Sequence, residues 1–126
     1  MLIINVLSVA LFAALFLQSG IDKLLDWKGN LGWLAGHFEK SFLSGVVPVL
    51  LGLVTFTEVL AGLICAYGVV ELVVFDQQVY ARIGIIFSLV ALLMLFIGQR
   101  IAQDYPGAAV LANYFLLGIA SLYFLV

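Results

Sequence analysis

Apolar positions along the chain gather in four long runs that few polar residues interrupt. The runs cover about residues 2–21, 46–70, 79–97 and 107–126. A helix needs roughly 20 mostly apolar residues to cross a bilayer, and each run is about that long. The runs are continuous rather than alternating, and a lipid-embedded backbone must pair internally, so helices are predicted rather than strands. The pattern therefore predicts an all-α fold, a transmembrane four-helix bundle that forms one domain over residues 1–126.

The link between the first two runs is the longest, and it contains a second kind of pattern. Four of its apolar residues are spaced three and four apart: Leu31, Leu34, Phe38 and Phe42. This spacing places them on one face of a helix. We expect a short amphipathic helix from about Asn30 to Phe42 that lies on the bilayer surface. The alternative is a loop that packs over the end of the bundle.

Composition agrees with a membrane location and excludes several functions. Hydrophobic residues make up 66% of the 126 residues and charged residues 10%, whereas soluble domains carry about 45–50% and about 25%. The net charge is −2, and no basic run is present that would bind a phosphate backbone, so no nucleic-acid partner is expected. The first and third links, which lie on one side of the membrane, hold more Lys and Arg than the second link and the termini on the opposite side. The positive-inside rule therefore favours a topology with both termini outside.

Glu58 is the residue most indicative of function, because it lies near the middle of the second run. An acid inside the membrane is costly and often marks a proton or ligand site. The alternative is a structural role, in which a neutral Glu58 donates one hydrogen bond to Asn113 or to a backbone carbonyl. Lys23 ends the first run and could pair with Glu58, but about 15 Å of depth would separate them. We therefore favour Lys23 as an anchor that snorkels to the interface.

Small residues predict the faces on which the helices pack. Gly62 lies on the same stripe of the second run as Glu58, and Asn113 lies with Ala109 and Ala120 on the fourth. Small side chains let helix backbones approach, and an asparagine can hydrogen-bond across the interface between two helices. Both Gly62 and Asn113 are therefore predicted packing residues.

Residues for cofactor chemistry are few. His37 is the only histidine and Cys65 the only cysteine. One of each cannot supply a bis-histidine haem site or hold an iron–sulfur cluster. We interpret His37 as a surface group, and we expect no metal site and no cofactor that the chain holds by itself.

Two segments resemble the DoxX-like family of small four-helix bacterial membrane proteins. Residues 16–24 (FLQSGIDKL) are similar to the family's first-helix signature, and residues 57–63 (TEVLAGL) are similar to its second helix. The resemblance matches four positions to the family pattern: Gly20, Lys23, Glu58 and Gly62. It implies a location in the bacterial inner membrane and a packing role for Gly20. The chain departs from the family in lacking basic residues at its N-terminus.

The resemblance also implies a function. Named members of the family include a small subunit of a thiosulfate-to-quinone or quinol-oxidising complex. The first hypothesis is therefore a small non-haem subunit, in a structural or accessory role, of a larger respiratory or quinone-linked oxidoreductase complex. It would contact membrane lipids, other membrane-protein subunits and a quinone. The alternative is a stand-alone small-solute carrier or lipid-binding protein with Glu58 in a midplane cavity. Independent catalytic activity is not expected under either hypothesis.

Overall fold

A computed structural model describes residues 2–125 of the chain, and all secondary structure within them is helical. It has five α-helices: α1 (Leu2–Leu25), α2 (Trp27–His37), α3 (Val47–Val70), α4 (Val79–Ile101) and α5 (Tyr105–Phe124). All of them except α2 are long and apolar enough to cross a membrane. The predicted all-α fold with four spans is therefore confirmed, and the chain is a multi-pass membrane protein. The end of the predicted fourth span, Val126, lies outside the described residues.

Local capping sets the ends of two helices. Asp104 precedes α5, and its Oδ1 accepts a hydrogen bond of 3.0 Å from the backbone N–H of Gly107. Pro106 occupies the first turn of the same helix, where a missing N–H costs nothing. Asp26 precedes α2 in the same way, and its Oδ1 accepts from the N–H of Gly29 at 3.3 Å. These caps satisfy backbone N–H groups that the helices leave unpaired at their starts.

The link between α3 and α4 is closed by a buried acid that the sequence did not single out. A π-helical turn, η2 (Glu71–Phe75), prolongs α3, and Asp76 then adopts a left-handed conformation with φ 52°. The Oε1 atom of Glu71 accepts hydrogen bonds from the N–H groups of Tyr80 (2.9 Å) and Ala81 (3.3 Å). Glu71 thus caps α4 from the preceding helix, with its negative charge at the positive end of the helix dipole.

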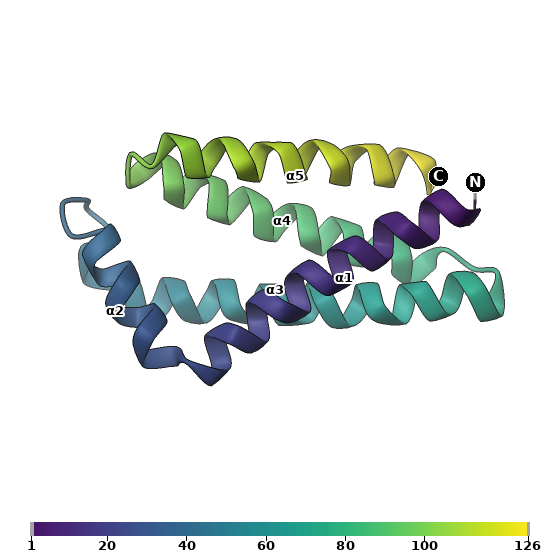
Figure 1. The fold of residues 1–126 in the computed structure, drawn as a ribbon, viewed down its shortest axis with the longest axis horizontal. Coiled ribbons are helices and arrows are strands. Elements are labelled where there is room, and N and C mark those ends of the chain that lie inside the picture. Colours follow the sequence, from purple (N-terminus) through teal and green to yellow (C-terminus); the bar gives the residue numbers. More distant parts are fainter. Residues whose placement is uncertain (1, 126) are drawn as a thin grey trace.

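The four long helices pack mainly with their sequence neighbours: α1 on α3, α3 on α4 and α4 on α5. Helix α1 packs along α3, crosses it obliquely, and brings its start close to the end of α5 (Figure 1). The main apolar core forms in this half of the bundle, where Val9, Phe12 and Phe16 of α1 pack with residues such as Ile85 and Leu92 of α4. Towards the opposite end, α1 diverges from α4 and α5, and α2 follows there (Figure 1).

The helix predicted in the first link exists, but its bounds differ from the prediction. It begins at Trp27 rather than about Asn30, because Asp26 provides the N-terminal cap. It ends at His37 rather than Phe42, and turns follow it. Phe42 does not share a packed face with the helix, since its side chain is 82% exposed, whereas Phe38 is buried.

The face of α5 that the sequence predicts to pack does not pack against the other helices of the same chain. Asn113 is exposed on the outside of the bundle, and so are Ala109 and Ala120. The residues of α5 that are buried lie on other sides of the helix: Ala108, Gly118 and Ser121. The contact with α4 is close at Gly118, where an added Cβ would lie 2.5 Å from Cδ2 of Leu89. Small residues occur on several sides of α5, so their spacing alone does not indicate which side packs.

Candidate functional site

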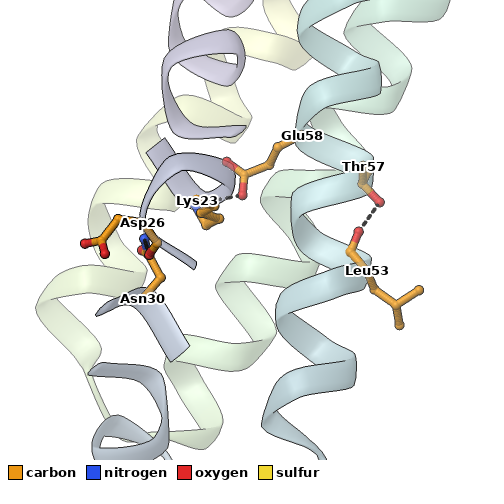
Figure 2. A network of polar contacts seen from close by, with 6 residues as sticks. All are labelled: Lys23, Asp26, Asn30, Leu53, Thr57 and Glu58. Carbon is orange, nitrogen blue, oxygen red and sulfur yellow. Dashed lines mark hydrogen bonds and ion pairs between the residues drawn. The ribbon is translucent and has the colours of Figure 1, made fainter. Parts of the chain in front are cut away.

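Lys23 and Glu58 form an ion pair inside the bundle. The Nζ atom of Lys23, in the last turn of α1, lies 3.0 Å from Oε1 of Glu58 in the middle of α3 (Figure 2). The Glu58 side chain is 2% exposed and the Lys23 side chain 19%. The favoured interpretation of Lys23 as a snorkelling anchor is therefore wrong, and the pairing that the sequence left open occurs. Glu58 does not contact Asn113, which is exposed on α5.

The path of the chain after α1 brings the two charges to the same depth. Trp27, at the start of α2, lies beside Gly52, since its Cη2 atom is 4.0 Å from the position of an added Cβ there. Gly52 is already inside α3, which begins at Val47. Helix α1 therefore ends level with the interior of α3, and the lysine does not have to reach across the expected 15 Å. Helix α2 continues from that point alongside the first turns of α3.

Two glycines bring α1 and α3 close together next to the ion pair. A Cβ added at Gly20 would lie 2.5 Å from Cγ2 of Val59 and 3.3 Å from its backbone N. A Cβ added at Gly62 would lie 2.7 Å from the backbone N of Leu17. Both glycines thus allow a backbone approach that a side chain would block, which is a common use of glycine between membrane helices. Gly20 and Gly62, two of the three predicted packing residues, lie at this contact.

The ion pair retains hydrogen-bonding capacity. The 3.0 Å contact is close enough for an ion pair, but it is not an aligned hydrogen bond, and within residues 2–125 Oε1 of Glu58 has no aligned donor. The hydroxyl of Thr55, one turn earlier on α3, is also buried without a hydrogen-bond partner in that part of the chain. A carboxylate oxygen can accept two or more hydrogen bonds, so Lys23 alone does not use the full acceptor capacity of Glu58.

A cavity of about 450 Å³ lies beside Lys23, between α2, α3 and α4. Along α3 it extends from Val47 to Val54, and Lys23 is its only lining residue from α1. Most of its walls are apolar, with lining residues that include Trp33, Leu34, Leu51 and Met94. Its volume is within the range of about 300–1,000 Å³ that small-molecule sites usually have. The cavity exists because α1 diverges from α4 and ends before it covers this half of the bundle. Only the short helix α2 covers the space that remains.

Helix α2 is fastened to the far side of the cavity by His37. Its Nε2 atom lies 2.6 Å from Oε1 of Gln99 on α4, with which it shares a hydrogen bond, and 3.7 Å from Oδ2 of Asp104. The ring of Trp33 stacks on the His37 ring at 4.5 Å between centroids. The interpretation of His37 as a surface group is therefore wrong. The spacing of four residues between Trp33 and His37 was the available signal, but nothing in the sequence indicates Gln99 as the partner.

Within the part of the chain that the structure describes, no group of three or more His, Cys, Asp or Glu side chains could hold a metal ion. The charged groups of the site are one ammonium and one carboxylate, and the apolar walls of the cavity lie beside the ammonium. Such an arrangement can donate and accept hydrogen bonds at one end of an apolar cavity.

Comparison with protein-family models, with curated proteins and with solved structures found no match to this chain. The DoxX-like resemblance therefore stays a prediction from residues 16–24 and 57–63. The four positions that carry it lie together at the contact of α1 with α3.

Proposed function

We propose that the protein binds a lipid-soluble small molecule that has an apolar body and an uncharged, oxygen-bearing head group. The observation that carries the proposal is the apolar cavity of about 450 Å³ with Lys23 of the ion pair in its wall. The apolar body occupies the cavity between α2, α3 and α4, and the head group lies at Lys23. This proposal develops the lipid-binding alternative, with the ion pair rather than Glu58 alone as the polar group.

The charge of the pair favours an uncharged head group. Lys23 and Glu58 together carry no net charge, so an anionic ligand would meet a lysine that is already neutralised, with a carboxylate behind it. The negative charge of such a ligand would be buried without a partner, which is unfavourable by several kcal/mol. A carbonyl oxygen needs only a donor, which the ammonium of Lys23 supplies. An isoprenoid quinone meets these requirements, and a quinone contact is also what the DoxX-like resemblance implies.

Binding of ubiquinone-1 by the purified protein in lipid nanodiscs tests this proposal. Trp33 lines the cavity, so quenching of tryptophan fluorescence reports occupancy. We expect saturable quenching that Val54→Phe weakens at least about tenfold, or about 1.4 kcal/mol, because the larger ring fills the cavity. Leu63→Phe adds a similar ring at an exposed position of α3 and should leave binding unchanged. Equal binding by the wild type and Val54→Phe would contradict the proposal, and tighter binding of oleate would contradict the uncharged head group.

The second proposal is that the chain acts as an accessory subunit of a quinone-linked oxidoreductase in the bacterial inner membrane. The resemblance of residues 16–24 and 57–63 supports it. So does the exposure of large apolar side chains such as Phe56 on α3, which is 69% exposed and available to lipids or subunits. Extraction of the tagged protein in mild detergent tests this role. Stoichiometric co-purification with haem or iron–sulfur subunits, visible in the absorption spectrum, is expected. Recovery of the chain alone, under conditions in which known complexes survive, would argue against it.

A further inference from the structure

Helix α5 presents to the outside of the bundle a stripe of exposed residues centred on Asn113. Its residues follow one another at alternating intervals of four and three, and all are exposed: Ala109, Asn113, Leu116, Ala120 and Tyr123. Leu116 is 67% exposed and Tyr123 78%. The buried residues of α5, such as Gly118 and Ser121, lie on the opposite side of the helix. A repeat of four and three is the spacing with which two helices pack along each other at a small angle.

Asn113 places an amide where lipid cannot satisfy it. It is eight residues after the start of α5 and eleven before its end, about 12 Å and about 16 Å along the helix. The hydrocarbon core is about 30 Å thick, so this position is near its middle. An asparagine side chain is too short to reach the head groups as a lysine does. Because Asn113 points away from the bundle, hydrocarbon would leave its donors and acceptor without partners.

We infer that a second copy of this chain packs on the exposed stripe of α5, with the two Asn113 side chains hydrogen-bonded to each other. An amide carries both donors and an acceptor, so the same residue from two copies is self-complementary across a two-fold axis. In two copies that share one orientation in the membrane, the two α5 helices run parallel and each stripe residue faces its counterpart. Ala109 and Ala120 let the backbones approach above and below the amide pair. The cavity lies between α2, α3 and α4, away from this stripe, so the inference stands independently of the proposed ligand.

Cysteine cross-linking in native membranes tests the contact. The parent is Cys65→Ser, which removes the only native cysteine. In that parent, Ala109→Cys and Ala120→Cys should each form disulfide-linked dimers under mild oxidation. Leu63→Cys, at an exposed position of α3, is the matched control and should stay monomeric. Cross-linking at Leu63 as efficient as on α5, or α5 cross-links only to a different protein identified by mass spectrometry, would overturn the inference.

The role of Asn113 needs a second measurement, because cysteines can also trap chance encounters. Energy transfer between labelled copies, measured over a range of protein-to-lipid ratios, gives the dimer affinity. Asn113→Leu keeps an apolar stripe but removes the amide, and we expect it to weaken the dimer by about 3- to 30-fold. Asn113→Gln retains the amide and should recover part of the loss. A monomer at every ratio, or an unchanged affinity in Asn113→Leu, would overturn the inference.

Discussion

Replacing Glu58 by glutamine separates the charge of the ion pair from its shape and hydrogen bonding. The variant leaves the ammonium of Lys23 without its counter-ion at a site where Glu58 is 2% exposed. Removing one partner of a fully buried pair typically costs about 3–5 kcal/mol. The Lys23 side chain is 19% exposed and lies near the end of α1, so it can reorient towards water in the variant. We therefore expect Glu58→Gln to lower the free energy of unfolding by about 2–3 kcal/mol, below the range for full burial.

The double variant decides whether this loss arises from the pair. Lys23→Gln combined with Glu58→Gln leaves two neutral amides that can hydrogen-bond to each other. The double variant should therefore lose less stability than the sum of the two single variants, with a coupling of about 1–3 kcal/mol. Lys28→Gln, at an exposed position of α2, is the matched control and should change stability by no more than about 0.5 kcal/mol.

Reversible unfolding in mixed detergent micelles, followed by circular dichroism, measures these free energies. The reasoning would be refuted if the two single losses added to within about 0.5 kcal/mol in the double variant, because independent sites behave in that way. It would also be refuted if Glu58→Gln were as stable as the wild type, since the charge of Glu58 would then contribute nothing.

Three further substitutions test other contacts of the fold. Gly62→Ala should destabilise the bundle by about 1–3 kcal/mol, because the new Cβ would lie 2.7 Å from the backbone of α1. Gly32→Ala is the control and should not destabilise the bundle, because the new Cβ meets open space. Glu71→Ala removes the cap of α4 and should cost about 1–2 kcal/mol, with faster hydrogen exchange at the first amides of α4; unchanged exchange would contradict the capping role. His37→Ala should release the end of α2 and speed proteolysis of the following link. Glu39→Ala, at an exposed position, is the control for the last two and should behave as the wild type.

The sequence indicates several individual residues of the candidate site, but it does not indicate how these residues are arranged in space. Glu58 was singled out because an acid in a long apolar run is unfavourable unless something compensates for it. The partner was misjudged because a depth estimate from run lengths assumed that α1 ends level with the start of α3. The contact of Trp27 with Gly52 shows that α1 ends deeper than that. Likewise His37 has its partner Gln99 62 positions away, and no local pattern indicates such a contact.

The sequence by itself determined that four apolar helices cross a membrane and roughly where they begin and end. Hydropathy, helix length and capping by residues such as Asp104 act within a few turns of the chain, so a local pattern records them. The tertiary structure decided the pairing of Lys23 with Glu58, the cavity beside it and the side of α5 that packs. Each of these depends on how far one helix is shifted and rotated against another, and that follows from close contacts such as those at Gly20 and Gly62. Such contacts join residues distant in the chain, so no window of sequence contains them.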